Sequence, residues 1–157
     1  MAKLSERELE QFIDDAFPER EGERHFDVVS VGDGRITLRL EPKPWMKRPG
    51  GSLSGPTLMG LADTVGYLLV AAELGPVAMA VTSNLNIHFL RRPPSDQTLF
   101  ADGELLKLGS RLALSEVRLR SGDDPEPVAH ATVTYAIPNG AAPGGAAAPD
   151  PPAPTSR

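Results

Sequence analysis

The 157-residue chain contains no cysteine, which excludes disulfide bonds, thiolate metal ligands and a cysteine nucleophile. Its three histidines, His25, His88 and His130, are scattered and form no pair at metal-ligand spacing, so we expect no metal site. Basic stretches are also absent. The 16 Lys and Arg residues face 21 Asp and Glu residues, and the net charge of −5 argues against nucleic acid as the main partner.

Long apolar runs without charge are missing as well. No stretch reaches the about 20 apolar residues of a transmembrane helix, so no membrane partner is expected. The first residues, MAKLSERELEQF, lack the apolar core of a signal peptide. The sequence therefore predicts a soluble, cytoplasmic protein.

The length of the chain fits one domain with a substantial core. Residues 138–157 hold six of the 16 prolines, six alanines and three glycines, without a periodic apolar face. This composition predicts a disordered tail. Residues 1–24 are interpreted as an N-terminal helix and a charged connector, which leaves 25–137 as the main folded domain.

Between these ends the sequence alternates between helix-like and strand-like patterns. Ser5 and Glu8 form a capping box for the first helix, and the glycines on either side of Asp33 predict a tight hairpin. A long helix follows that is apolar on all sides and therefore buried, and then come strand-like runs with short turns. Such strands form an antiparallel sheet with the helix on one face, so the fold class is α+β. The predicted helices cover 4–17 and 56–74, and the predicted strands lie within 25–41 and over 79–90, 97–107, 111–120 and 127–137.

Charge is almost absent from residues 49–72, where Asp63 is the only charged residue and lies in the middle of the apolar helix. Burying an unpaired carboxylate is costly and needs compensating partners. Two interpretations are open. Asp63 either caps a shorter helix that begins at Thr64, or it is a functional acid.

The glycine-rich loop GGSLSGP comes directly before the same helix. A helix N-terminus offers unpaired N–H groups that can bind a carbonyl oxygen or an oxyanion. Because Pro56 has no N–H, Gly55 is the candidate donor, and an ordinary turn capped by Ser54 or Gly55 is the alternative. Gly55 and Asp63 are eight residues apart, about 12 Å along a helix, so they cannot contact one reacting carbonyl from the same chain. If they cooperate, the site needs two subunits.

Two further groups of polar residues are candidate ligand contacts. Strict alternation along 79–90 places four polar side chains on one face, which is either solvated or ligand-facing: Thr82, Asn84, Asn86 and His88. Four cations lie at predicted strand ends and either bind phosphates or are simply solvated: Arg91, Arg92, Lys107 and Arg111.

Three segments together resemble the hotdog-fold acyl-CoA thioesterases of the phenylacetate-degradation (PaaI-like) type: GGSLSGPTLMGLADTVGYLLVAA, AVTSNLNIHFLRRP and LLKLGSRLALSEVRL. The resemblance extends over residues 25–137. It implies a long central helix wrapped by a curved antiparallel sheet, and a homodimer or a dimer of dimers with active sites at the subunit interface. It also implies a hydrolase that cleaves an acyl-CoA to a carboxylic acid and free CoA. No cofactor is implied, because CoA is part of the substrate.

The same resemblance implies roles for single residues. Asp63 matches the family's helix aspartate, a nucleophile or general base, and Gly55 matches the glycine whose N–H polarises the thioester carbonyl. Thr82 falls where some relatives have a hydroxyl residue that helps to place water. The family's motif histidine is replaced by Ser54, and the asparagine of the preceding loop falls near Arg48.

We therefore expect the substrate to contact Ser54, Arg48 and Tyr67, with the four cations named above near the CoA phosphates. Two other functions stay open. The changes at Ser54 and Arg48 are also compatible with a protein that binds acyl-CoA without cleaving it, as a sensor or carrier partner. A structural oligomerisation domain would not bind CoA esters at all.

Overall fold

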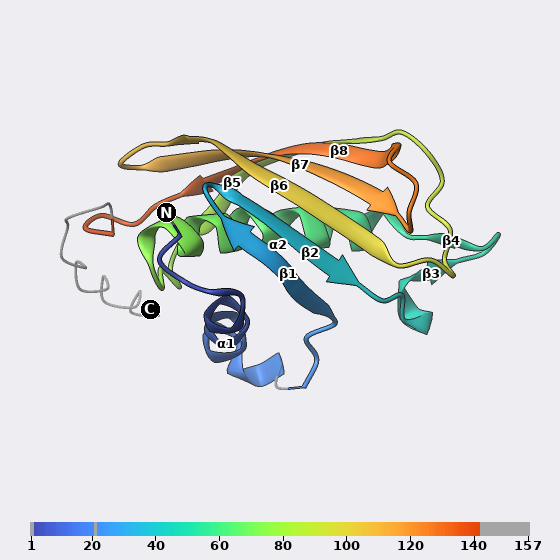
Figure 1. The fold of residues 1–157 in the computed structure, drawn as a ribbon, viewed down its shortest axis with the longest axis horizontal. Coiled ribbons are helices and arrows are strands. Elements are labelled where there is room, and N and C mark those ends of the chain that lie inside the picture. Colours follow the sequence, from blue (N-terminus) through green and yellow to red (C-terminus); the bar gives the residue numbers. More distant parts are fainter. Residues whose placement is uncertain (1, 21, 142–157) are drawn as a thin grey trace, which may run out of the picture.

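The computed structural model describes residues 2–20 and 22–141 and has an α+β fold, in which an antiparallel sheet curves around one long helix (Figure 1). The strand order in the six-stranded sheet is β1-β2-β6-β7-β8-β5. This confirms the predicted fold class. The helices are α1 (Glu6–Ala16) and α2 (Gly55–Leu74), the short 3-10 turns are η1 (Pro18–Arg20) and η2 (Pro44–Met46), and the strands are β1 (Phe26–Gly32), β2 (Arg35–Leu40), β3 (Lys47–Arg48), β4 (Ser52–Leu53), β5 (Val81–Phe89), β6 (Leu99–Leu108), β7 (Leu112–Ser121) and β8 (Pro127–Ala136).

The first helix and the first hairpin form as the local sequence predicts. The Ser5 side chain accepts a hydrogen bond from the Glu8 N–H, and the Glu8 carboxylate accepts one from the Ser5 N–H, which completes the capping box. In the hairpin, Asp33 and Gly34 form the two-residue loop with φ values of +51° and +71°. Positive φ at both positions is what a hairpin turn of this type requires.

Helix α2 is the centre of the core. Ser54 caps it by accepting a hydrogen bond from the Thr57 N–H at 3.3 Å, and the helix is buried continuously from Val65 to Ala72. Its length and hydropathy would suit a membrane span, yet 61% of that stretch is buried inside the fold, as in the core helix of a soluble protein. The sheet packs closely on the helix, since a Cβ at Gly103 would clash with the Val65 side chain. The predicted cytoplasmic location stays a prediction.

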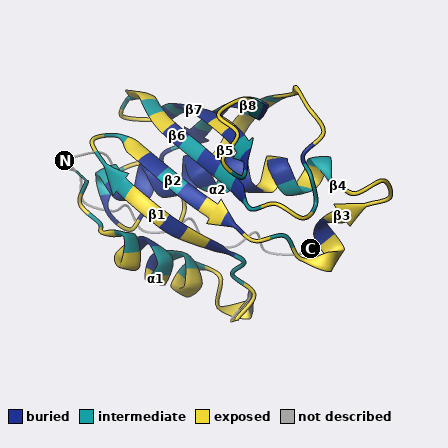
Figure 2. Cartoon of the chain, turned by 45° about the vertical axis from the view of Figure 1, so that its right-hand side comes forward, coloured by how far each residue is buried: buried dark blue, intermediate teal, exposed yellow. Residues whose placement is uncertain are grey.

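Strand β5 is one edge of the sheet and is poorly covered. It pairs only with β8, and each of its nine residues is exposed or half-buried (Figure 2). Val81 and Phe89, at its two ends, are 59% and 52% exposed. A long exposed edge presents unpaired backbone groups, which another strand can bind.

The strict alternation expected along this strand is wrong at one position. A β-bulge at Ser83 makes Thr82 the partner of Tyr135, while Asn84 pairs with Thr134. An extra residue shifts the alternation by one, and residues paired across two strands share a face. Thr82 therefore faces helix α2 beside Tyr135, whereas Asn84 and the rest of the polar row lie on the outer face.

The N-terminal segment packs onto the main domain. Helix α1 buries Leu9 and Phe12, and the Phe12 ring lies 5.4 Å from the ring of Tyr67 on α2. The predicted disordered tail over 138–157 lies outside the described residues from residue 142 onward and stays a prediction.

Candidate active site

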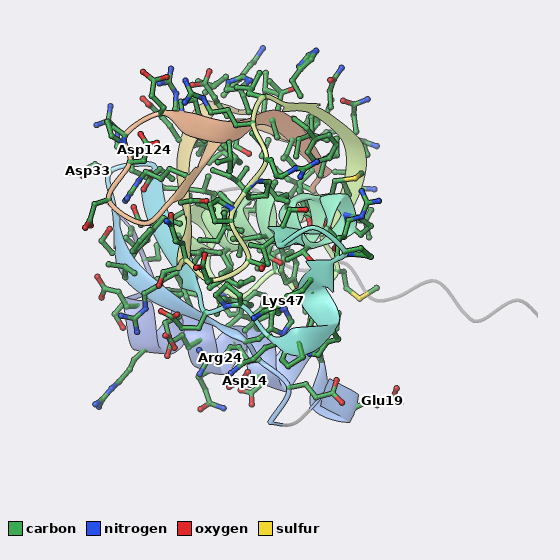
Figure 3. All side chains as sticks on the ribbon, turned by 90° about the vertical axis from the view of Figure 1, so that its right-hand side faces the viewer. Asp14, Glu19, Arg24, Asp33, Lys47 and Asp124 are labelled. Atoms are coloured by element: carbon green, nitrogen blue, oxygen red, sulfur yellow. The ribbon has the colours of Figure 1, made fainter. Side chains whose placement is uncertain are left out.

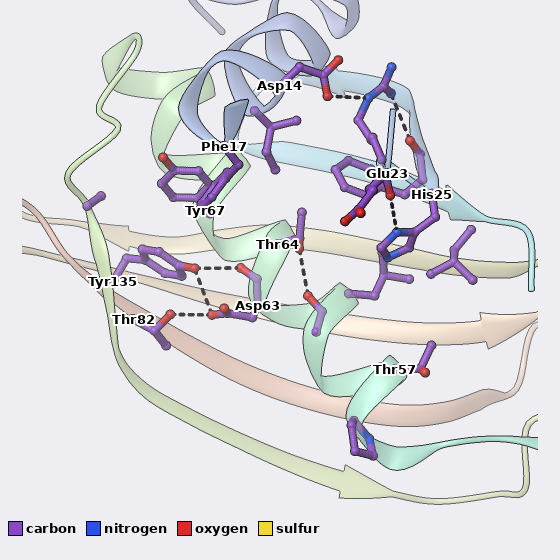
Figure 4. Close-up of a pocket in the computed structure, with 18 of the residues that line it drawn as sticks. Asp14, Phe17, Glu23, His25, Thr57, Asp63, Thr64, Tyr67, Thr82 and Tyr135 are labelled. Atoms are coloured by element: carbon purple, nitrogen blue, oxygen red, sulfur yellow. Dashed lines mark hydrogen bonds and ion pairs between the residues drawn. The ribbon is translucent and has the colours of Figure 1, made fainter. Parts of the chain in front are cut away.

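Asp63 lies in the middle of α2 and does not cap it, so the cap interpretation is wrong. The helix begins eight residues earlier, at Gly55. The Asp63 carboxylate oxygen Oδ1 accepts hydrogen bonds from Thr82 Oγ1 at 2.6 Å and from Tyr135 Oη at 2.9 Å (Figure 4). Within the described parts of the chain, no cation pairs with this carboxylate. The described residues thus leave its charge unneutralised, which makes Asp63 a candidate functional acid.

Asp63 lines a cavity of about 800 Å³, which lies between the N-terminal half of α2, the start of β5, and α1 with the connector that follows it. This volume is in the range of small-molecule sites. Besides Asp63, the cavity is lined by hydroxyl side chains, of which Thr82 and Tyr135 contact the carboxylate, and by aromatic rings. The hydroxyl residues are Ser54, Thr57, Thr64, Thr82 and Tyr135, and the aromatic residues are Phe17, His25, Phe26, Trp45 and Tyr67.

The connector that closes one side of the cavity is held by Arg24. The guanidinium group lies 3.1 Å from the Asp14 carboxylate and 3.3 Å from that of Glu10, both on α1 (Figure 3). The next residue, His25, packs edge-on against Trp45 with ring centroids 5.1 Å apart. Ion pairs therefore fix this wall in place.

The only two tyrosines of the chain both line the cavity. Tyr67 Oη donates to the Ala78 carbonyl at 3.0 Å. Burial raises the pKa of both tyrosines, and the nearby Asp63 charge raises the pKa of Tyr135 further, although a hydrogen bond with Thr82 acts in the opposite direction. Both hydroxyl groups are therefore protonated donors near neutral pH.

Gly55 is the first residue of α2, eight residues before Asp63 on the same helix. Within the residues described, its backbone N–H has no acceptor, so it is free to bind a ligand oxygen. As expected, it is too far from Asp63 to share a carbonyl, since eight residues of continuous helix span about 12 Å. Ser54 lines the cavity, but its hydroxyl group is engaged in the helix cap. Arg48 is exposed on β3 and does not line the cavity that contains Asp63.

The structure does not bring the four candidate phosphate ligands together. Arg91 and Arg92 line a second cavity of about 650 Å³ with three carboxylates, and Arg91 pairs with Glu126 at 3.3 Å. Lys107 and Arg111 lie at the opposite end of the ten-residue strand β6, near its turn to β7. Because ten strand residues span roughly 30 Å, the two pairs cannot bind the same phosphate group.

Tyr135 is a residue of the candidate site that the sequence patterns above did not predict. On strand β8, Tyr135 shares the buried face with Ala131 and Val133, and it is the residue on that face that carries a hydroxyl group. Alternation along 127–137 places this hydroxyl toward the helix, so the pattern held a usable signal. The bulge that turns Thr82 inward has no comparable signal.

Comparisons with known proteins agree with this fold. Residues 50–128 match the family model of the Thioesterase superfamily. A candidate esterase of Halobacterium salinarum is 35% identical over 95 residues, which cover 57% of this chain and 62% of that protein. A candidate esterase of Saccharolobus solfataricus is 28% identical over 96 residues, which cover 61% of this chain and 67% of that protein. The chain thus spans about two thirds of the length of these curated relatives.

Solved structures of thioesterases are also similar to this chain. A candidate thioesterase from a Silicibacter species is 38% identical, with a TM-score of 0.79 over 88% of this chain and 94% of that one. The PaaI protein of the Escherichia coli phenylacetic acid degradation operon shares the fold with a TM-score of 0.67 at 20% identity, over 82% of this chain and 94% of that one. The chain therefore belongs to the thioesterase superfamily and has the hotdog fold of its PaaI-like members.

Proposed function

We propose that this thioesterase hydrolyses an acyl-CoA to a carboxylic acid and free CoA, with Asp63 as the residue that acts at the thioester carbonyl. The observation that carries the proposal is the environment of the Asp63 carboxylate. The carboxylate lies on an apolar helix, accepts hydrogen bonds from two hydroxyl groups, has no cation partner among the described residues, and lines a cavity large enough for an acyl group.

Few other residues of the cavity could act as the nucleophile or the general base. The chain has no cysteine, and His25, the histidine that lines the cavity, has its Nδ1 2.8 Å from the Glu23 carbonyl. Asp63 would remove a proton from water while the hydroxide adds to the carbonyl carbon. The tetrahedral intermediate then breaks its C–S bond, and the CoA thiolate takes the proton back from Asp63. Direct attack by the carboxylate, followed by hydrolysis of the resulting anhydride, is the alternative route.

The second catalytic part would come from a partner subunit. Strand β5 begins beside Asp63, to which Thr82 is bonded, and ends beside Gly55, where a Cβ would lie 3.5 Å from the Phe89 ring. When two β5 edges pair in antiparallel fashion about a twofold axis, the end of one strand meets the start of the other. Gly55 of the partner subunit would then lie close to Asp63.

Two features of the edge support this homodimer. The first is a pair of exposed apolar side chains at each end of β5, which a partner would cover. The pairs are Met79 with Val81 and Phe89 with Leu90. The second is the free N–H of Gly55, which would donate to the oxyanion that develops on the thioester carbonyl. A dimer of dimers would keep the same pair of sites.

Among the four cations, Arg92 is the best candidate to bind a phosphate group of CoA. It lies three residues after the end of β5 and, in contrast to Arg91, has no acidic partner among the described residues. The three carboxylates in the same cavity give that cavity a net formal charge of −1, so Arg92 would act with few other cations.

A thiol-release assay over short, long and aryl acyl-CoAs tests the proposal. We expect turnover of at least one substrate, and a loss in kcat of about 10² to 10⁴ in Asp63→Asn, as for a positioned acid or base. Asp102→Asn is the matched control, because Asp102 also accepts a threonine hydroxyl, that of Thr37 at 2.8 Å, but lies outside the cavity. Unchanged turnover in Asp63→Asn would contradict the proposal. Tight binding of CoA esters without turnover would instead indicate a non-catalytic binding protein, and no binding at all a structural domain.

A further inference from the structure

Tyr135 is the second hydroxyl donor on the Asp63 carboxylate, and neither of the two chemical routes uses it to transfer a proton or to form a bond. Its Oη donates to Asp63 Oδ1 at 2.9 Å and lies 3.1 Å from the Asp63 backbone carbonyl. The residue is 5% exposed, and its ring packs against that of Tyr67 with centroids 5.8 Å apart. The hydroxyl group is therefore held in one place relative to both the helix backbone and the carboxylate.

Gly66 is what lets this tyrosine approach the helix. A Cβ at position 66 would lie 2.8 Å from the Val133 side chain, closer than Cβ atoms come to other atoms, and in a tight contact of 3.1 Å with the Tyr135 ring. Residues three apart on a helix share a face, so Gly66 and Asp63 meet the same strand. The close contact between α2 and β8 is thus located at the level of the carboxylate.

The two donors act on the same oxygen atom. Thr82 and Tyr135 are register partners on β5 and β8, and both donate to Oδ1. Oδ2 accepts no hydrogen bond from any residue that the structure describes. Two fixed donors on one oxygen prevent rotation of the carboxylate and leave the other oxygen for the cavity that Asp63 lines.

We infer that Tyr135 is a positioning residue for Asp63, which together with Thr82 fixes Oδ1 and presents Oδ2 as the oxygen that acts on water or on the thioester carbon. The inference rests on the proposed function of Asp63. In either chemical route Oδ2 uses one lone pair, either to take the proton from water or to form the bond to carbon. Oδ1 keeps both of its hydrogen bonds, so the site needs no reorganisation during the step.

The variant Tyr135→Phe tests this role, because it removes the hydroxyl group and keeps the buried ring. We expect kcat to fall by about 10- to 100-fold, the usual range for a hydrogen bond to a charged group, while KM changes less than about twofold. Ser115→Ala is the control. Ser115 is equally buried, its hydroxyl donates to the Val133 carbonyl at 3.2 Å, and it does not line the cavity, so this variant should keep its activity.

A double variant separates positioning of Asp63 from direct action of Tyr135 on the substrate. If Tyr135 acts only through Asp63, then Tyr135→Phe added to Asp63→Ala should leave the residual rate unchanged. A further loss in that background would mean that Tyr135 acts on the substrate by itself, and it would overturn the inference. So would a wild-type kcat in Tyr135→Phe when Asp63→Asn is inactive, a result that leaves the proposed function intact. Thiol release that is independent of Asp63 would overturn the proposed function itself.

Discussion

The two ends of strand β5 differ in how completely one chain builds them. At the first end, Thr82 and Tyr135 hold the Asp63 carboxylate at the wall of a cavity. At the other end, Gly55 lies close to the Phe89 ring, and its N–H has no acceptor among the described residues. One end therefore carries an acid without an oxyanion donor, and the other a donor without an acid. In the proposed homodimer, each chain would therefore supply complementary halves of two sites.

After the loss expected for Asp63→Asn, the largest effect comes from removing the donor at the Gly55 end. Gly55→Pro deletes the N–H at the first helical position, where proline is well tolerated. We expect kcat for thiol release to fall by about 10² to 10³, as when one oxyanion donor is lost. Gly55→Ala keeps the N–H and should lose much less, because its Cβ would meet the Phe89 ring at an ordinary contact distance of 3.5 Å. Equal activity of the two variants would remove the N–H from the mechanism.

A smaller effect is expected when the two ends are kept intact but the strand edges repel each other. In a twofold pair centred near Leu85, Asn84 and Asn86 of one strand lie opposite Asn86 and Asn84 of the other. The double variant Asn84→Asp/Asn86→Asp places like charges opposite each other, which should weaken the dimer by about tenfold or more. Sedimentation measures the dissociation, and turnover should fall with the dimer fraction. Thr132→Asp, on the adjacent strand β8 and the same face, should leave the dimer intact.

The smallest effect concerns stability and tests whether the Asp63 end carries an uncompensated charge. Asp63→Asn should leave the free energy of unfolding unchanged or raise it slightly, because it removes a half-buried carboxylate that no cation of the described segments pairs with. Asp102→Asn should lower it by about 1 kcal/mol or less, because Asp102 pairs with Arg120 at 2.8 Å in a partly exposed bridge. Thermal unfolding of the two variants gives the comparison. A larger loss for Asp63→Asn would identify this carboxylate as a stabilising residue.

Local sequence was enough to predict most elements of the fold. The capping box at Ser5, the loop at Asp33 and Gly34, and the cap at Ser54 depend on residues within a few positions of each other. Helix α2 was predicted to be buried because it is apolar on every side, and this also identified Asp63 as exceptional.

Features that depend on distant parts of the chain were predicted less well. The bulge at Ser83 reverses the direction of Thr82, and it arises from pairing with β8, about 50 residues later in the chain. The Tyr135 hydroxyl reaches Asp63 only because Gly66 allows close packing of that strand. The separation of Arg91 from Lys107 follows from the direction of β6, which residue type and charge do not reveal.

Mixing two inactive variants tests most directly whether the site is shared between subunits. Dimers of Asp63→Asn and dimers of Gly55→Pro are combined in equal amounts and allowed to exchange subunits, and thiol release is measured. A mixed dimer contains one site with both defects and one site with neither, and random exchange makes half of the dimers mixed. Recovery to about one quarter of the wild-type rate is therefore predicted for a symmetric dimer. A rate no higher than the mean of the two separate variants, with subunit exchange verified, would contradict the shared site.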